Sequence, residues 1–198
     1  VRRYPLQQLR SQVALIPQDP FLFSLTIRNN LTYDEPDREL PPIEHAAQLA
    51  ELLDAIDEFP DGMETIVGER GMTLSGGQKQ RATLARGLIR DARILAMDDC
   101  FSSVDTRTEE RILGRLKEVR QGRTTLLVSH RVSTARHADR IFVMEGGRIL
   151  ESGTHAELIA KGGYYSDLEA VQSNQDQDRA RKAALLRNLD IDVRVVNG

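Results

Sequence analysis

Three short apolar runs, each followed by polar residues, constrain the fold of this 198-residue chain more than any other feature. They cover residues 13–16, 93–97 and 124–128, and continuous hydrophobicity of this kind is typical of strands in a parallel sheet with both faces covered. Open α/β sheets bind their ligands at the carboxyl ends of such strands. The pattern therefore predicts an α/β fold with a ligand site at one edge of a parallel sheet.

The connection between the first two runs is much longer than an ordinary crossover. Residues 26–92 show helical spacing in IEHAAQLAELLDAI and again in GGQKQRATLARGLI, so we expect a helical subdomain inserted into the sheet domain. Residues 106–119 place apolar residues among charged ones and predict an amphipathic crossover helix. Residues 140–153 predict a β-hairpin that turns at its two adjacent glycines.

Composition excludes several classes of protein. The formal net charge is -3 and basic residues are scattered among acidic ones, so we expect no nucleic-acid partner. No stretch approaches the roughly 18 to 20 apolar residues of a membrane-spanning helix, so we expect a soluble chain. The single cysteine, Cys100, excludes an internal disulfide, fits a reducing compartment and is interpreted as a small buried hydrophobe.

The strongest chemical signal is the pentapeptide Leu74-Ser75-Gly76-Gly77-Gln78, which is followed at once by a helical pattern. Two glycines before a helix leave backbone N–H groups uncovered, the serine adds a hydroxyl, and the helix contributes its positive end. The segment therefore suits an anion such as a phosphate. The alternative is a glycine turn with the serine as a helix cap, which is the commoner role of such a sequence taken alone.

Three weaker signals lie at the predicted strand ends. Asp98 can hold Mg²⁺ through water and Asp99 can orient an attacking water, although an aspartate-rich strand end or helix cap explains this pair equally well. His130 can donate to a phosphate, and Gln18 can offer an amide oxygen to a metal. For each of these two an ordinary surface or core role is the alternative. The occurrence of all four signals in one chain favours a nucleotide site.

These residues give the chain a strong resemblance to the ATPase domains of ABC transporters over residues 1–168. In that family PQD is the Q-loop, LSGGQ the signature motif, ILAMDD the Walker B strand, SSVD the D-loop and SH the histidine switch loop. All five occur here in family order. The stretches VGERG and DPFLFSLTIRNN resemble the exporter branch, in particular bacterial half-transporters of the multidrug and lipid exporter group that pair as heterodimers.

The resemblance implies an α/β fold with a P-loop NTPase-type parallel sheet core and an inserted α-helical subdomain. It also implies ATP and Mg²⁺ as cofactors. Gln18 would bind Mg²⁺ and sense the transmembrane domain, and Asp98 would hold Mg²⁺ through water. His130 would contact the γ-phosphate.

The resemblance further implies contacts between two subunits. Ser75, Gly76 and Gly77, with Gln78 beside them, would contact the γ-phosphate of ATP bound to the partner subunit, and Asp105 in the D-loop would communicate across the dimer. The partners would be a second ABC subunit and the transmembrane domain of the same transporter. The implied location is the cytoplasmic face of the inner membrane, where the domain powers efflux of a drug- or lipid-like substrate.

One departure from the family concerns hydrolysis. The family places a glutamate after the Walker B aspartate to orient and polarise the attacking water, whereas this chain has Asp99. A carboxylate misplaced by about 1 Å can cost around a hundredfold in rate. We therefore expect Asp99 to belong to a degenerate, slowly hydrolysing site, while the intact signature completes a competent site on a different partner. Because His130 is retained, the degeneracy is expected to be partial.

A second departure is that no G-x-x-x-x-G-K-[ST] pattern occurs in the chain. In the family the Walker A strand, loop and helix come upstream of the Q-loop, so the resemblance implies a domain that begins partway through. The Walker A loop is the main cradle of the β- and γ-phosphates. We expect the 198-residue chain by itself to bind ATP weakly or not at all and not to hydrolyse it.

The expected organisation has four parts. Residues 1–25 belong to the ATPase core with the Q-loop, and residues 26–92 form the helical subdomain with the signature. Residues 93–168 return to the core with Walker B, the D-loop and the histidine loop, and residues 169–198 form a polar tail that is disordered or a loose surface helix. Two other classes stay open: a soluble ABC ATPase without a membrane partner, and a non-enzymatic truncation that docks on other cassettes.

Overall fold

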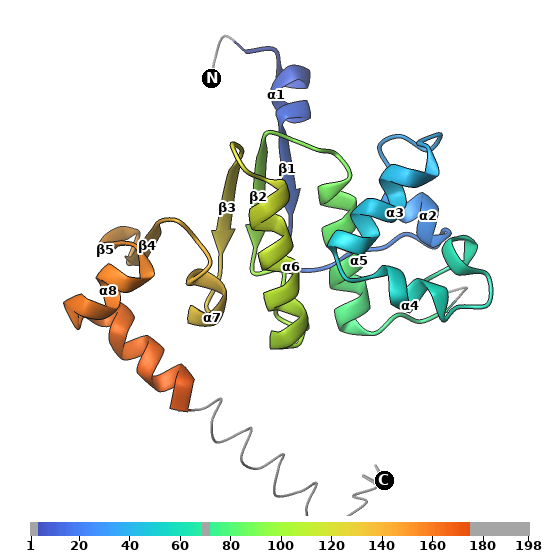
Figure 1. Ribbon diagram of the computed structural model, residues 1–198. Helices are drawn as coiled ribbons and strands as arrows, with labels where there is room; N and C mark the ends of the chain where they lie inside the picture. The colour runs from blue at the N-terminus through green and yellow to red at the C-terminus, as the bar shows by residue number, and fades with distance from the viewer. Residues whose placement is uncertain (1–3, 69–71, 175–198) are drawn as a thin grey trace, which may run out of the picture. The chain divides into compact units, whose positions relative to one another are not determined.

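The computed structural model describes residues 4–68 and 72–174 of the chain (Figure 1). The chain forms two compact units, with the boundary between His137 and Ala138. The described elements of the first unit are α1 (Leu6–Gln12), β1 (Val13–Ile16), α2 (Ile27–Leu31), α3 (Leu40–Leu49), α4 (Leu53–Asp57), η1 (Gly62–Glu64), α5 (Gly76–Leu88), β2 (Ile94–Asp98), α6 (Thr106–Val119), β3 (Thr124–Val128) and α7 (Val132–Ala135). Those of the second are β4 (Ile141–Glu145), β5 (Arg148–Gly153) and α8 (His155–Lys161), and residues 164–174 are helical as well.

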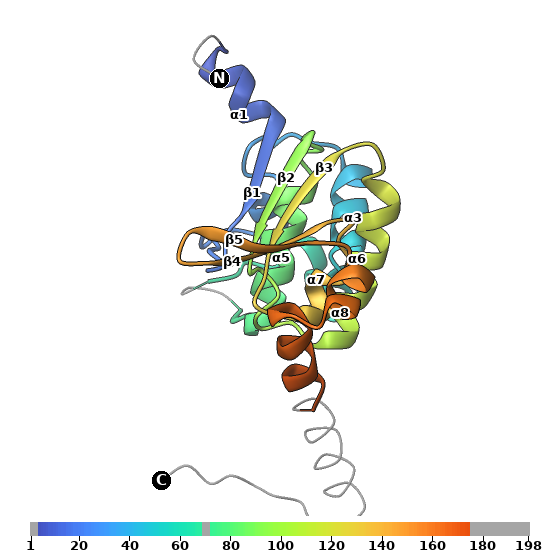
Figure 2. The same cartoon turned by 90° about the vertical axis from the view of Figure 1, so that its left-hand side faces the viewer.

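The three predicted strands form one parallel sheet in the order β1-β2-β3 (Figure 2). β1 and β3 have the predicted bounds, and β2 lies one residue later than predicted. The register places Ile16 beside Met97, and Asp98 beside Val128. The carboxyl ends of all three strands therefore meet at one edge of the sheet, and the α/β fold class is confirmed.

The expectation that both faces of the sheet are covered is wrong for the described residues. The side chains of β1 and β2 that are buried belong to Ala14, Ile16, Leu95 and Met97. On the opposite face Leu15 is 64% exposed, Leu126 57% and Val128 54%. Helices α3 and α6 lie to one side of the strands in Figure 2. Continuous hydrophobicity shows that both faces of a strand are suited to packing. It does not show that the described residues cover both faces.

Helices α2 to α5 occupy the stretch 26–92, in which we expected a helical subdomain. α5 packs on α2 and α3 and also on β1. It approaches β1 so closely that a Cβ atom on Gly87 would lie 2.5 Å from Cγ1 of Ile16. The buried apolar side chains of these helices and of the sheet form one continuous cluster. The four-part division stays a prediction, and α5 links two of its parts.

The helix expected over IEHAAQLAELLDAI is broken into α3 and α4, which corrects the sequence interpretation. Glu51 lies between them with φ of 53°, in the left-handed region, where a non-glycine residue is uncommon. Its carboxylate pairs with Arg111 at 2.9 Å and with Arg115 at 2.6 Å. Both arginines lie on α6, about sixty residues away, so periodicity within the segment could not reveal the break.

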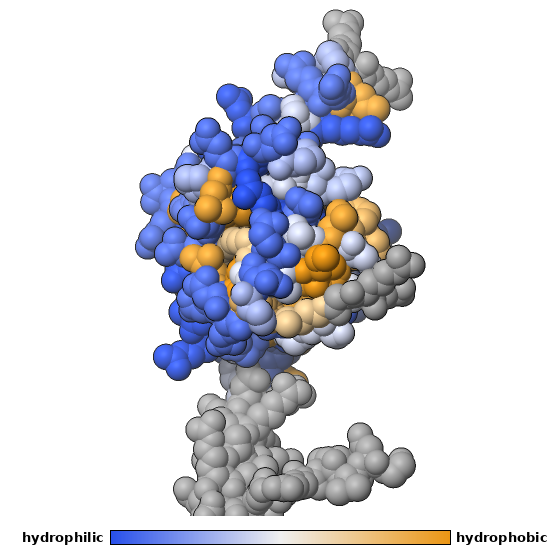
Figure 3. Space-filling view, turned by 90° about the vertical axis from the view of Figure 1, so that its right-hand side faces the viewer, coloured by the Kyte–Doolittle hydropathy of each residue, from blue (hydrophilic) through white to orange (hydrophobic). Residues whose placement is uncertain are grey.

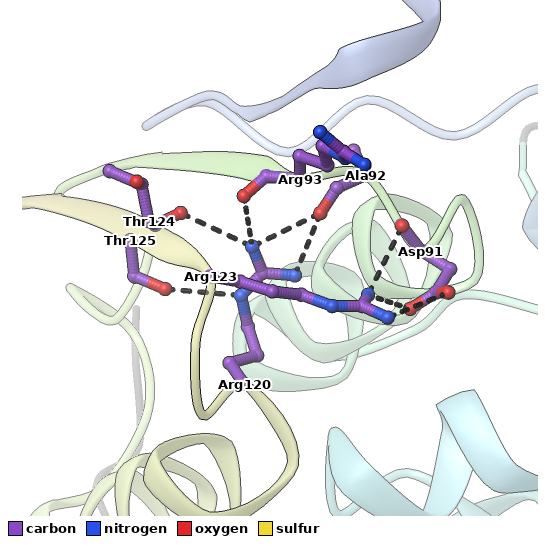
Figure 4. A network of polar contacts seen from close by, with 7 residues as sticks. All are labelled: Asp91, Ala92, Arg93, Arg120, Arg123, Thr124 and Thr125. Carbon is purple, nitrogen blue, oxygen red and sulfur yellow. Dashed lines mark hydrogen bonds and ion pairs between the residues drawn. The ribbon is translucent and has the colours of Figure 1, made fainter.

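A buried arginine joins the end of α6 to the beginnings of two strands (Figure 4). Arg120 is 8% exposed, and both of its terminal nitrogens lie 3.1 Å from the carbonyl oxygen of Ala92. The same guanidinium donates to the carbonyls of Arg93 at 3.3 Å and Thr124 at 3.2 Å, and to the hydroxyl of Thr125 at 3.1 Å. Burial lowers its pKa below the usual value for arginine. The guanidinium thus satisfies strand-end carbonyls that would otherwise lose their solvation.

The second unit contains the predicted hairpin. β4 and β5 pair antiparallel, and Gly146 and Gly147 both have positive φ, at 53° and 75°. This conformation is the one a two-residue type I′ turn requires. α8 follows, with Thr154 as its N-cap in a capping box. Of the predicted tail, residues 169–174 are helical, and the part from residue 175 onward lies outside the described residues.

Cys100 is buried, as expected for a small hydrophobe, with 2% of its surface exposed. Burial is the largest cause that raises the pKa of its thiol to about 12, and the neighbouring carboxylates of Asp99, Glu109 and Asp98 add to this. Since the thiolate is the reactive form, Cys100 should react with iodoacetamide at least tenfold more slowly in the native protein than in urea, at mildly alkaline pH. Mass spectrometry of timed samples measures this, and equal rates would contradict the burial.

Candidate functional site

The sheet edge brings together the residues predicted at the three strand ends. Asp98 is the last residue of β2, Gln18 follows β1 by two positions, and His130 follows β3 by two. All three are exposed. Asp99 adopts φ of 40°, and its backbone N–H donates to the carbonyl of Val128 at 2.9 Å. The edge therefore presents a carboxylate, an amide and an imidazole to solvent, with a second carboxylate on a sharply turned backbone.

The signature segment forms the N-terminus of α5, as predicted, and it is a capping box. The Ser75 hydroxyl oxygen accepts the N–H of Gln78 at 3.2 Å, and the Gln78 side-chain oxygen accepts the N–H of Ser75 at 2.8 Å. The helix-cap interpretation left open in the sequence is therefore correct. It does not exclude an anion, because the Ser75 hydroxyl keeps its proton as a donor and the amides of Gly76 and Gly77 have no acceptor within the helix.

The capping box bears on the role expected of Gln78. Its side-chain oxygen is engaged with the backbone at the start of its own helix. Of the signature residues, Ser75, Gly76 and Gly77 line an open pocket of about 430 Å³, and Gln78 is not among the lining residues. We therefore assign Gln78 the role of holding the segment in shape, and a phosphate contact from its side chain stays a prediction.

The D-loop, residues 102–105, forms the other wall of the same pocket. The lining residues are Ser75, Gly76, Gly77, Arg81, Ser103, Val104 and Asp105. The structure thus brings Asp105 together with the signature glycines. Gln18, Asp98, Asp99 and His130 do not line this pocket and lie at the sheet edge instead. The predicted site residues therefore form two groups.

The pocket depends on a close approach between the signature helix and the D-loop. A Cβ atom on Gly77 would lie 2.9 Å from the carbonyl oxygen of Ser103, which real Cβ atoms essentially never do. At Gly76 the nearest atoms would be the Ser103 side chain at 3.4 Å, an ordinary contact. Gly77 is therefore required by the D-loop of its own subunit, in addition to any role of its amide toward a ligand.

Arg81 was missed in the sequence analysis. It lies four residues after Gly77, and residues four apart share a helix face, so this spacing could have placed it in the pocket. Its guanidinium donates to the carbonyl oxygen of Glu51. The pocket wall therefore carries one positive charge, held by the turn between α3 and α4.

Asp105 is the N-cap of α6 and accepts the N–H of Thr108 at 3.0 Å. Hydrogen bonds from the backbone and side chain of Thr108 lower the pKa of the carboxyl below its ordinary value. The group is therefore ionised at neutral pH. The negative charge also lies at the positive end of the α6 dipole, where it is favourable.

The segment after Gln18 forms an aromatic cluster that is tied to α5. Phe23 stacks on Tyr33 with ring centroids 4.8 Å apart and meets the edge of Phe21 at 4.9 Å. Phe21 is 62% exposed and Tyr33 60%, so two of the three rings of this cluster lie at the surface. Figure 3 shows the side of the molecule on which α2 to α4 lie, with apolar patches in a mainly hydrophilic surface.

Arg86 and Asn30 hold this cluster against the signature helix. Arg86 on α5 donates to the carbonyls of Phe21 at 2.8 Å and Asn30 at 2.6 Å, and to the Asn30 side-chain oxygen at 2.9 Å. Asn30 is 1% exposed, and its amide nitrogen donates to the carbonyls of Phe23 and Thr26, both at 3.0 Å. The bend after the first strand and the helix that begins at the signature are therefore directly connected.

The site has the parts that ATP chemistry uses: backbone amides and a hydroxyl at a helix N-terminus, and a carboxylate at the edge of a parallel sheet. A carboxylate in that position fits Mg²⁺, which keeps several waters and takes one or two protein carboxylates besides nucleotide phosphates. Within the described residues no three His, Cys, Asp or Glu side chains are grouped to hold a metal by themselves. The fold and site define an ATP-binding domain of the α/β class.

The comparison with known families gives the same answer. The model of the ABC transporter family matches residues 1–102, and the chain belongs to that family. It is 48% identical over 169 residues to the ABC transporter ATP-binding protein YknU of Bacillus subtilis (strain 168), which covers 85% of this chain and 29% of the relative. It is 44% identical over 174 residues to the ATP-dependent lipid A-core flippase of Burkholderia pseudomallei (strain 1710b), covering 87% and 29%.

A solved structure shares the fold. A bacterial Atm1-family ABC exporter with ATP bound matches with a TM-score of 0.82 and 38% identity, over 87% of this chain and 30% of the exporter chain. The fold is that of an exporter ATP-binding domain, which confirms the exporter-type resemblance. The chain spans less than a third of the length of these relatives. Within residues 4–68 and 72–174, no helix combines the length and apolar character needed to cross a bilayer.

Proposed function

We propose that this chain is part of the motor domain of an ABC exporter, in which ATP binding and hydrolysis drive substrate across a membrane. The observation on which this depends is the open pocket between Ser75–Gly77 and the D-loop, because the signature residues at the N-terminus of α5 line it. ATP held on a partner subunit would bring its terminal phosphate into this pocket. Ser75, Gly76 and Gly77 would then donate to the phosphate and close the dimer.

The residues at the sheet edge would contact the nucleotide that this subunit itself binds, whereas the signature would contact the partner's nucleotide. Asp98 would hold Mg²⁺ through water and Gln18 would be a second ligand, the bound ion offsetting phosphate charge. His130 would donate to the γ-phosphate, and Asp99 would accept a hydrogen bond from the attacking water. All four roles use exposed or half-exposed side chains at the carboxyl ends of parallel strands.

The aromatic cluster is the proposed contact for the transmembrane domain of the same transporter. Exposed Phe21 and Tyr33 offer an apolar surface on which a helix from that domain can pack. Through Arg86 the contact reaches α5 and so the signature. The domain would then lie at the cytoplasmic face of the inner membrane, and likeness to a lipid A-core flippase supports a lipid- or drug-like substrate.

We propose further that Asp99 makes this subunit the degenerate half of a heterodimer, in which the partner's site performs most of the hydrolysis. Its carboxylate is one methylene shorter than the family's glutamate, and its backbone is held at φ of 40° by the bond to Val128. The reach of the side chain toward the attacking water is therefore reduced.

Substitutions at Asp99 test the proposed function and its asymmetry together. In the assembled full-length transporter, Asp99→Asn should lower ATP turnover by no more than about twofold, and Asp99→Glu should raise it, because a correctly placed carboxylate recovers part of a roughly hundredfold deficit at this site. Phosphate release from purified transporter measures both. Loss of nearly all turnover in Asp99→Asn would make Asp99 the principal catalytic residue and contradict the asymmetry. Absence of ATP-dependent turnover in the wild type would contradict the proposed function.

A further inference from the structure

The D-loop is held from two sides by side chains of other segments. On one side Gln80 of α5 donates its side-chain N–H to the Ser102 hydroxyl at 2.6 Å and accepts the N–H of Ser103 at 2.7 Å. On the other side Arg131 donates to the carbonyl oxygens of Ser102 at 3.1 Å and Val104 at 3.4 Å. The loop is thus fixed both to the signature helix and to the segment after β3.

Arg131 is itself anchored by a buried carboxylate. Glu109 on α6 is 1% exposed, and its Oε2 lies 2.8 Å from the Arg131 guanidinium. Its other oxygen, Oε1, accepts the hydroxyl of Thr134, which is fully buried. A buried carboxylate is tolerated only when paired and hydrogen-bonded, so these partners hold the Arg131 head in one place.

Arg131 also lies directly after His130 in the chain. Its backbone N–H donates to the Ser129 hydroxyl at 3.1 Å, so Arg131 belongs to the same turn as the histidine. A shift of the D-loop would therefore displace the Arg131 guanidinium and also the turn that contains His130. The same shift would act on the signature helix through Gln80.

We propose that Arg131, anchored by Glu109, is a positioning residue that couples the D-loop to His130. The inference rests on the proposed function, in which a partner subunit contacts the D-loop and His130 contacts a phosphate. Arg131 itself touches no reacting atom. It links the position of the D-loop to that of His130. When a partner subunit contacts the D-loop, His130 of this subunit therefore moves in response.

Hydrogen exchange tests the coupling without any nucleotide. In the full-length protein, Arg131→Gln should speed amide exchange about tenfold both in the D-loop and in residues 129–131, because both segments lose the same anchor. The matched control is Arg136→Gln, since Arg136 pairs with Glu110, the α6 neighbour of Glu109, on the exposed surface. The control should change neither segment. Faster exchange in only one segment, or in neither, would overturn the proposal.

Kinetics of the assembled transporter separate positioning from a merely structural ion pair. Arg131→Gln should lower kcat for ATP at least tenfold with little change in KM. The reason is that the variant loses the alignment of His130 with the phosphate and keeps the binding of ATP. The double variant Glu109→Gln/Arg131→Gln leaves no unpaired buried charge, so its unfolding midpoint should return toward wild type while kcat stays low. If kcat of the double variant recovered together with its unfolding midpoint, the ion pair would have a structural role only, which would contradict the proposal. If the wild type lacked ATPase activity, the proposed function would fail, while the exchange experiment would still decide the coupling.

Discussion

Replacing Gly77 with alanine should lower ATP turnover of the assembled transporter by about a hundredfold. The new Cβ would lie 2.9 Å from the carbonyl oxygen of Ser103, and this is backbone that cannot rotate away. The D-loop or the start of α5 must therefore shift, and a displacement near 1 Å at such a site costs about this factor. Steady-state ATPase assays on purified variant transporter measure the effect.

Two matched glycines separate this clash from general effects of alanine. Gly76→Ala would place its Cβ at 3.4 Å from the Ser103 side chain, an ordinary contact, and should keep turnover within about fivefold of wild type. Gly114→Ala on α6 has nothing within 4 Å and should leave activity unchanged, with a small gain in stability. Equal losses in Gly76→Ala and Gly77→Ala would show that the close approach to the D-loop is not the reason for the glycine.

Truncating Arg120 to alanine should have the largest effect on stability. Its guanidinium donates to three carbonyls and one hydroxyl near the sheet, and the substitution removes all of these hydrogen bonds (Figure 4). Of the three carbonyls, that of Arg93 keeps the backbone N–H of Thr124 as a donor. The loss of these hydrogen bonds, above all at the buried carbonyl of Ala92, costs about 3 kcal/mol in total, which lowers the unfolding midpoint by about 10 °C. Thermal unfolding of the purified full-length protein measures this shift.

The neighbouring Arg123 provides the control. It pairs with Asp91, whose side chain is 76% exposed, so this ion pair lies at the surface and contributes little. Arg123→Ala should leave the midpoint near that of the wild type. If both variants were destabilised to the same degree, the burial of Arg120 would not be what stabilises the strand ends.

The individual strands, the hairpin and the signature helix could be predicted because each depends on residues close together in the sequence. Hydrophobic runs marked the strands, paired glycines marked the turn at Gly146, and the signature marked the start of α5. The edge of the sheet followed, because parallel strands place their carboxyl ends side by side. These are local patterns, and local patterns are what a single sequence reveals.

The remaining features depend on contacts between distant residues. The break at Glu51 depends on Arg111 and Arg115, sixty and more residues away, and no periodicity within α3 indicates it. Likewise the connections made by Gln80 and Arg131 join segments that the motifs treat as separate. Motifs indicated which residues are important, but the side chains that hold those residues in position required the structure.

A structure of the assembled transporter with Mg²⁺ and a non-hydrolysable ATP analogue tests the central claim most directly. We predict that the Gly77 amide nitrogen and the Ser75 hydroxyl oxygen each lie about 2.7 to 3.1 Å from γ-phosphate oxygens of the nucleotide on the partner subunit. The D-loop would still form the other wall of that pocket. A nucleotide whose γ-phosphate contacts neither residue, in a closed dimer, would contradict the account.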